Sequence, residues 1–267
     1  MLSIVMATYN RAATIARAVE SVRQQTYPDW DLIGVVDGST DATTQVLQRF
    51  TDPRIRVVTN AVNRGVCAAK NTGLEHIRGD WFTTLDSDDE IVPDALEVMM
   101  QCVQQTGATA VTCNCLDAQT GLLTGKGPAV DGWLTPEVTA ACRGEFWGVT
   151  QTRLLGDLRF DERLPGHEAT VWLLINRRAR RYYLHRALRI YHTEGADRIT
   201  KASHARGLRG KVDVYDVLGE HAAYLGELRR VDRAAYRATY SRILAARFLR
   251  PLLKRSDDAR SDPEPKR

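Results

Sequence analysis

The sequence of 267 residues has little of what marks membrane, secreted or repetitive proteins. No segment approaches the roughly 20 consecutive apolar residues that cross a bilayer. The opening stretch MLSIVMATYN lacks the basic start and the small-residue cleavage site of a secretory signal. No internal repeat is visible, and 19 glycines and 9 prolines do not make a collagen-like or largely disordered chain. We therefore expect a globular, cytoplasmic protein with one large domain or a domain with an appendage.

Cysteine is sparse, and its spacing excludes a disulfide framework. The five cysteines include no C-x-x-C pair: Cys67, Cys102, Cys113, Cys115 and Cys142. We expect reduced and mostly buried thiols, because the number is odd and the spacing is unpaired. Cys113 and Cys115 lie closest together, but two thiols alone do not predict a zinc site.

Charge is nearly balanced overall but unevenly distributed. The formal net charge is +4, whereas residues 229–255 alone carry nine Arg or Lys against one acid, Asp232. That segment is therefore +8 and the rest of the chain is −4. The basic character belongs to the C-terminal part and bears on what that part contacts.

The first hundred residues alternate between β-branched apolar runs and helical patterns. Strands are predicted at 2–7, 30–37, 54–59 and 81–86, and helices at 12–25, 42–50 and 65–77. This alternation is typical of a mostly parallel sheet with helices on its faces, an α/β class of fold. Ligands bind such sheets beyond the carboxyl ends of the strands. Polar residues end each strand, at Thr8, Asp37, Asn60 and Asp86, so we predict a site at that edge.

The alternation loosens in the second half. A helix is predicted at 93–105, a strand at 108–115, a hairpin or loop at 116–132, a helix from about His167, and one or two strands from 181. Helical patterning dominates from Lys211, with Tyr236, Tyr240, Leu244, Phe248 and Leu252 four residues apart. Pro251 should end or kink that helix.

The acidic run TLDSDDE follows the fourth predicted strand. On spacing alone it is typical of a helix-capping loop, because acids before a helix are favoured by the helix dipole. Crowded carboxylates at the end of a buried strand also repel one another and lose hydration, which a divalent cation would offset. Mg²⁺ and Mn²⁺ prefer oxygen ligands, so a metal site is the functional alternative.

The motif VVDGSTDAT places Asp37 at the end of a strand, before Gly38. The carboxylate could accept hydrogen bonds from a base or a ribose, and the glycine would permit close approach. An Asx-turn with a helix N-cap is the structural alternative.

Several motifs in order resemble family 2 glycosyltransferases, which have the GT-A fold. They are SIVMATYNRAATIARAVESVRQQTYPDWDLIGVVDGSTDAT and NRGVCAAKNTGLEHIRGDWFTTLDSDDE. The resemblance is close over Leu2 to Leu96 and looser to about Thr200. It implies a domain at 1–210 with a nucleotide-binding half (1–100) and an acceptor-binding half (101–210). A basic amphipathic helical extension (211–254) and a disordered tail (255–267) would follow.

The resemblance implies inverting transfer of a sugar from a nucleoside diphosphate sugar, by default a UDP-sugar, to an acceptor hydroxyl in polysaccharide, lipopolysaccharide or other surface glycan. Nucleotide-sugar contacts would come from Ala7, Thr8, Tyr9, Asp37, Lys70 and Asp86. A stacked base would lie on the Tyr9 ring, and Lys70 is otherwise a surface lysine. The family pattern often has two aspartates before GS; here the first is Val36.

The same resemblance assigns the metal and the base. Asp86 and Asp88 match the Asp-x-Asp pair, with Asp88 and His192 as ligands of Mn²⁺ or Mg²⁺; His192 is otherwise a solvated loop residue. Arg198 would neutralise phosphate charge. FDERLPGHEATVW places Glu168 where the family has its base aspartate, with His167 replacing the preceding glutamate. The alternative for Glu168 is a first-turn acid that favours the helix dipole.

Two other functions are considered. A non-catalytic or regulatory nucleotide-sugar binder is suggested by Val36 and by His167. A nicotinamide-dependent dehydrogenase is disfavoured, because TYNRAAT replaces a glycine-rich turn after the first strand. The acceptor would be a glycan or a lipid-linked glycan.

The basic C-terminal segment has three alternatives: it packs on the domain, docks on a partner, or lies on anionic lipid at the inner face of the membrane. Nucleic-acid binding is disfavoured, because no recognition module accompanies the arginines.

Overall fold

The first half of the chain forms the alternating sheet that the sequence predicts. The computed structural model describes residues 1–193 and 207–261, with side chains up to Leu253. Its first elements are β1 (Leu2–Thr8), α1 (Ile15–Arg23), β2 (Trp30–Asp37), α2 (Thr43–Gln48), β3 (Ile55–Asn60), α3 (Val66–Glu75) and β4 (Trp81–Thr84). Their bounds agree with the predicted ones to within a few residues. β1 pairs in parallel with β2 and β4, and β2 pairs in parallel with β3.

The second half extends this sheet with strands of both directions. Its elements are β5 (Glu90–Ile91), α4 (Ala95–Thr106), β6 (Ala110–Asp117), β7 (Gly132–Leu134), α5 (Pro136–Ala141), β8 (Phe146–Gln151), α6 (Ala169–Arg178) and β9 (Arg181–Tyr191). β8 is antiparallel to β4 and β6, while β9 is parallel to β6. The carboxyl ends of β1 to β4, β6 and β9 therefore face one edge, and β8 begins there. Sequence patterning does not predict β8, because Gly148 and polar residues interrupt its apolar run.

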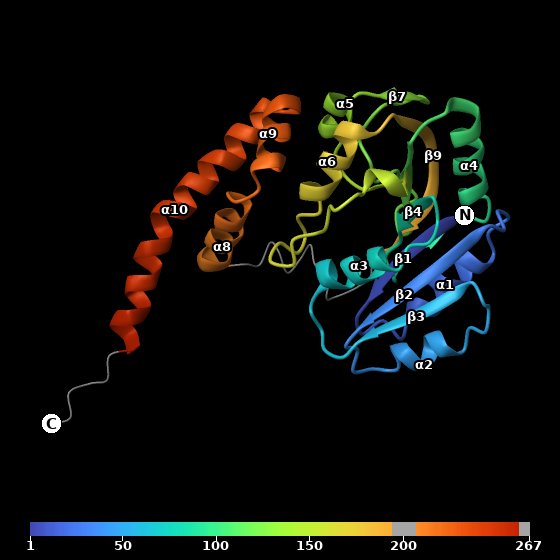
Figure 1. Cartoon of the computed structure of the whole chain (residues 1–267), viewed down its shortest axis with the longest axis horizontal. Helices are drawn as coiled ribbons and strands as arrows, with labels where there is room; N and C mark the ends of the chain where they lie inside the picture. The colour runs from blue at the N-terminus through green and yellow to red at the C-terminus, as the bar shows by residue number, and fades with distance from the viewer. Residues whose placement is uncertain (194–206, 262–267) are drawn as a thin grey trace.

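Helices cover both faces of the sheet. Leu2, Ile4 and Met6 of β1 point into one hydrophobic cluster, which also contains buried residues of α1, α2 and α4. Val5 points the other way, into a cluster with residues of α3 and α6. Figure 1 shows α3 on one side of the strands and α2 on the other. The alternation of side chains along β1 therefore builds a core on each face.

Three helices form an extension beside the sheet (Figure 1): α8 (Leu208–Leu218), α9 (Ala222–Val231) and α10 (Arg233–Ser261). Its hydrophobic cluster joins Val214, Leu218 and Ile243 to Leu164, which lies in the loop before α6. Of the two outcomes predicted at Pro251, the end of the helix is wrong, because α10 continues through Pro251 to Ser261. Residues 262–267 of the predicted tail lie outside the described residues.

The apolar stripe predicted on the last helix is not the face that packs. Ile243 and Ala246 are buried, whereas Tyr240, Leu244, Phe248 and Leu252 are exposed. Within the described chain, no helix combines the length and apolarity that a bilayer crossing needs.

The cysteines are free, and four of the five are buried. Cys113 and Cys115 lie on β6 in the apolar core, where burial raises the pKa of the Cys115 thiol to about 12. A neutral thiol is a poor metal ligand. The described residues contain no group of three or more metal-ligating side chains.

Gly38 is predicted to be essential to the packing of the β2–α2 turn. Its φ is +63°, and an added Cβ would lie 2.3 Å from the Asn63 nitrogen and 2.4 Å from the Val62 carbonyl carbon. Gly121 has a similar φ of +68° but open space around it. We expect Gly38→Ala to lower the free energy of unfolding by at least about 2 kcal/mol more than Gly121→Ala does. The reason is that the backbone of Val62 and Asn63 would have to move to make room for the new Cβ at position 38. Urea denaturation measures both variants, and equal losses would contradict the packing argument.

Candidate active site

The acidic run after β4 crosses the edge of the sheet and reaches β9. Asp86 lies just past the end of β4, and Glu90 begins β5, which pairs antiparallel with β9. Arg189 of β9 donates to Asp86 at 2.6 Å and to Asp89 at 2.7 Å. Asp89 is buried, whereas the Asp86 side chain is 47% exposed. The run does not cap a helix, because α4 begins at Ala95 with Asp94 as its N-cap.

Arg189 determines the charge state of this edge. Burial opposes a charged guanidinium, but Asp86 and Asp89 outweigh it and raise the pKa of Arg189 above its usual value. Burial also raises the pKa of Asp86, yet Arg189 and then Lys70 bring it below its ordinary range. Sequence reasoning missed Arg189. Its position between Leu188 and Ile190 in a strand was a signal, since a buried arginine requires acidic partners.

Lys70 joins two of the predicted site residues. Its ammonium lies 3.4 Å from Glu168 Oε1 and 3.9 Å from Asp86 Oδ1. The side chain is only 14% exposed, so Lys70 is not a plain surface lysine. Burial lowers the pKa of Lys70, but Asp86 and Glu168 outweigh it, and the net shift is upward. Residues from α3, the end of β4 and the start of α6 thus converge on one point.

Glu168 is the residue immediately before α6, and its side chain makes no capping hydrogen bond to that helix. The carboxylate instead lies beside Lys70, 23% exposed. The helix-dipole alternative alone does not explain this orientation. The structure therefore places a carboxylate at the site despite the His167 substitution.

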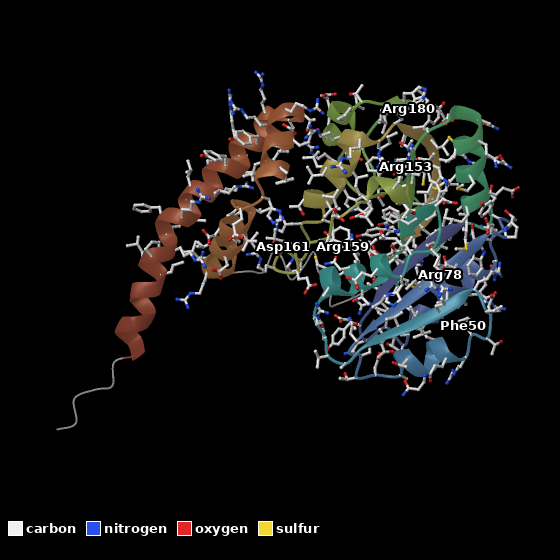
Figure 2. The ribbon with its side chains drawn as sticks, in the orientation of Figure 1. Phe50, Arg78, Arg153, Arg159, Asp161 and Arg180 are labelled. Atoms are coloured by element: carbon white, nitrogen blue, oxygen red, sulfur yellow. The ribbon has the colours of Figure 1, made fainter. Side chains whose placement is uncertain are left out.

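The loop that carries Glu168 is held from both sides. Asn71 of α3 exchanges two hydrogen bonds of 2.9 Å with the backbone of Phe160. On the other side, His221 contacts Asp161 at 3.0 Å and Glu220 pairs with Arg163 at 2.9 Å. Figure 2 shows Asp161 between the helical extension and the sheet. The extension is therefore part of what positions Glu168.

Asp37 has a structural role that the sequence did not predict. Its buried carboxylate accepts hydrogen bonds from the Asn60 side chain at 2.8 Å and from the backbone of Arg64 and Gly65 at 3.0 and 2.8 Å. It does not cap α2, whose N-cap is Ala42. Gly38 permits close approach of the chain's own backbone at Val62. Asp37 thus holds the β3–α3 loop at the edge of the site.

The end of β1 presents the residues expected to contact a nucleobase. The Tyr9 side chain is 40% exposed, and Thr8 is buried with a hydroxyl that has no hydrogen-bond partner within the described part of the chain. Ala7 is partly buried beside them. The next residue, Asn10, is held at a φ of 51° through contacts of its backbone with Ser39 and of its amide oxygen with Thr40. An unpartnered buried hydroxyl at a site edge suits a polar ligand group.

Asp88 and His192 are the two residues expected to bind metal. Asp88 lies on the acidic run, and His192 directly follows β9, where the run contacts that strand. The His192 backbone donates to Asp89 at 2.8 Å, and His192 Nε2 lies 2.7 Å from Glu90 Oε1. His192 Nδ1 is buried with no hydrogen-bond partner among the residues that the structure describes. A proton on Nε2, donated to Glu90, leaves the Nδ1 lone pair for a cation, as in many carboxylate–histidine–metal arrangements. Burial and Asp86 raise the pKa of Asp88, and Arg11 and Arg189 oppose that shift only in part.

A second carboxylate that sequence reasoning missed lies at the same edge. Glu145 precedes β8, which runs antiparallel to β4, and the Trp147 indole donates to the Thr84 carbonyl at 3.0 Å. Desolvation by the surrounding protein raises the pKa of the exposed Glu145; Arg189 opposes this shift, and repulsion from Asp86 adds to it. Glu145 therefore shares the electrostatic environment of the site. Arg198, by contrast, lies outside the described residues.

Comparisons with known proteins agree with this fold. The family model described as glycosyl transferase family 2 matches residues 3–128. The GalNAc(5)-diNAcBac-PP-undecaprenol beta-1,3-glucosyltransferase of Campylobacter jejuni is 34% identical over 208 residues, which cover 74% of this chain and 67% of that protein. WfgD of Escherichia coli, named a UDP-Glc:alpha-D-GlcNAc-diphosphoundecaprenol beta-1,3-glucosyltransferase, is 37% identical over 38% of this chain and 40% of its own length.

Solved structures share the fold at low sequence identity. S. aureus TarS 1-349 in complex with UDP-GlcNAc aligns with a TM-score of 0.72 at 18% identity, over 92% of this chain and 72% of that one. Mannosyltransferase PcManGT of Pyrobaculum calidifontis, in complex with GDP-Man and Mn2+, aligns with a TM-score of 0.57 at 20% identity, over 92% and 73%. The chain therefore belongs to glycosyltransferase family 2 and is a glycosyltransferase with the GT-A fold.

Proposed function

We propose that this enzyme transfers a sugar, with inversion, from a nucleoside diphosphate sugar to an acceptor hydroxyl in the biosynthesis of a surface glycan. The observation that carries the proposal is the position of Lys70, between Asp86 and Glu168. A cation between a nucleotide-binding carboxylate and a base suits a bound diphosphate, whose negative charge it would offset.

The donor that we propose is a UDP-sugar. WfgD is named for UDP-Glc, and TarS was solved with UDP-GlcNAc. The exposed Tyr9 ring would stack on the base, and the free Thr8 hydroxyl would bond a polar group of the nucleotide. Asp86 would accept hydrogen bonds from the ribose. Asp37 acts by holding the β3–α3 loop at the edge where the base would bind.

The proposed reaction forms one bond and breaks one. The acceptor oxygen attacks the anomeric carbon from the side opposite the diphosphate, and the bond from that carbon to the phosphate oxygen breaks. The hydroxyl proton passes to the Glu168 carboxylate as general base. Lys70 orients that carboxylate and offsets charge on the departing diphosphate.

The residues present fit a divalent metal. Asp88 and the Nδ1 atom of His192 would hold it, with phosphate oxygens and water completing the shell. When bound, Mn²⁺ or Mg²⁺ would stabilise negative charge on the leaving nucleoside diphosphate. The rest of the acidic run supports this arrangement, since Glu90 orients His192 and Asp89 fixes its backbone.

The acceptor that we propose is a lipid-linked glycan bound by the second half of the domain. The Campylobacter and Escherichia relatives are named for undecaprenol-linked acceptors. The alternative of a non-catalytic sugar-nucleotide binder is disfavoured, because the Glu168 carboxylate lies beside Lys70 in spite of the changed motif.

Replacement of Glu168 tests the base. We expect Glu168→Gln to reduce kcat about 10³-fold, within the usual range for a general base, while the affinity for UDP is retained. Turnover of UDP-sugars with a diphosphoundecaprenol-type acceptor and manganese measures kcat, and calorimetry measures affinity. Glu162→Gln is the matched control, because Glu162 lies in the same loop but pairs with exposed Arg64.

Glu145→Gln completes this test. If Glu145→Gln abolished turnover and Glu168→Gln did not, the base would be Glu145 and the assignment made here would be wrong. Unchanged turnover in both variants would exclude a carboxylate base at either position.

Removal of Asp88 tests the metal. We expect Asp88→Ala to lose most of the manganese-dependent part of UDP affinity, about tenfold or more, because one of two protein ligands is gone. Calorimetric titration with UDP, once in manganese and once in EDTA, separates the metal-dependent part of the UDP affinity from the metal-independent part. Asp80 is an exposed aspartate before β4. The control variant Asp80→Ala should therefore keep the wild-type difference in UDP affinity between manganese and EDTA. Equal affinity of the wild type in manganese and in EDTA would contradict the metal site.

A further inference from the structure

The last helix carries an exposed face that nothing in the described chain covers. Arg233, Arg237, Tyr240, Leu244, Phe248 and Leu252 follow one another at intervals of three or four residues and form what we call the outer face of α10. Tyr240, Leu244, Phe248 and Leu252 are 40, 50, 72 and 49% exposed. Four large apolar side chains in one row on a surface helix mark an interaction site.

The opposite face of α10 makes the contacts with the rest of the protein. Ile243 and Ala246 are buried there, and Ile243 packs with Val214 and Leu218 of α8. Polar contacts lie on the same side: Arg242 donates to the Tyr215 hydroxyl at 3.0 Å, and Arg250 pairs with Asp216. Internal packing therefore does not need the outer face. Figure 1 shows α10 running away from the sheet.

Basic residues predominate along most of the last helix. The sequence from Arg233 to Arg255 contains six arginines and one lysine but no acidic residue, and Asp257 and Asp258 follow near the end of α10. Within the described residues, no carboxylate pairs with Arg233 or Arg237. The face thus combines a basic end with an apolar end. Basic side chains beside exposed Leu and Phe on one helix face are typical of helices that lie in the interface of an anionic bilayer.

We infer that the outer face of α10 binds an anionic phospholipid surface, with Leu244, Phe248 and Leu252 entering the acyl boundary and Arg233 and Arg237 contacting phosphates. The surface and the active site are mechanically connected. Leu164, four residues before Glu168, packs in the same cluster as Ile243. A lipid-linked acceptor would then meet an active site already at the membrane; this consequence alone rests on the proposed function.

Vesicle flotation of the full chain tests the inference without donor or acceptor. We expect binding to phosphatidylglycerol vesicles, weak binding to phosphatidylcholine vesicles, and a decrease with salt. The double variant Arg233→Glu/Arg237→Glu should weaken binding about tenfold or more, because each basic side chain near an anionic surface contributes about a factor of five. Leu244→Ser/Phe248→Ser should weaken it by a similar factor, because apolar burial is lost.

Matched controls separate this face from general surface properties. Arg78→Glu changes an exposed arginine away from α10 (Figure 2), and Leu122→Ser changes an exposed leucine in a turn. Both should bind like the wild type. All variants should keep the wild-type melting temperature and the wild-type shift with UDP, which are measured independently of vesicles.

Three results would overturn the inference. The first is equal binding of the wild type to phosphatidylglycerol and phosphatidylcholine. The second is equal binding of the outer-face variants and the controls. The third is a wild-type dimer that Leu244→Ser/Phe248→Ser converts to a monomer without a change in vesicle binding, which would assign the face to a second copy of the chain.

Discussion

A buried guanidinium on β9 is the constraint on which the active site depends. Arg189 is 5% exposed, and a buried charge is tolerated only where carboxylates compensate it. Asp86 and Asp89 provide that compensation, and they lie in the run that leaves β4 and joins β9 through β5. Leaving such a charge unpaired costs about 3–5 kcal/mol. The pairing therefore fixes the acidic run in place and keeps Asp88 and His192 close to the same edge.

A second constraint comes from outside the nucleotide-binding half. The loop that carries Glu168 lies between α3 and the helical extension, and both sides bind it through specific contacts. The extension is therefore more than an appendage, since loss of its packing at Leu164 would loosen the loop that bears Glu168. Membrane binding and catalysis would be linked through the helical extension. Its last helix would bind the membrane, and its three helices hold the loop that carries Glu168.

The sequence predicts the features that depend on local patterns. The strands of the first half are continuous β-branched runs that end in polar residues, and the edge where they end carries the site. Lys70, Asp86 and Glu168 follow from motifs, and the structure brings them together. Their roles in donor binding and catalysis stay predictions until they are measured.

The features that sequence reasoning missed depend on contacts between distant residues. Arg189 pairs with carboxylates 100 and 103 residues away, so its neighbours Leu188 and Ile190 indicate burial but not which acids compensate its charge. Asp37 binds a loop more than 20 residues later, so its structural role was also hidden. Periodicity identified the apolar stripe of α10 but not which side faces solvent. Ile243 and Ala246 make the packing contact because of where α8 lies.

The central claim is that Arg189 holds the acidic run in the form that binds nucleotide and metal. Calorimetric titration of Arg189→Lys with UDP and manganese tests it most directly, because lysine keeps the charge but cannot reach both carboxylates with a planar fork. The claim predicts about tenfold weaker binding or more, with no loss of affinity in Arg186→Lys, whose arginine pairs with Asp94 at the surface. Wild-type affinity in a folded Arg189→Lys protein would contradict the claim.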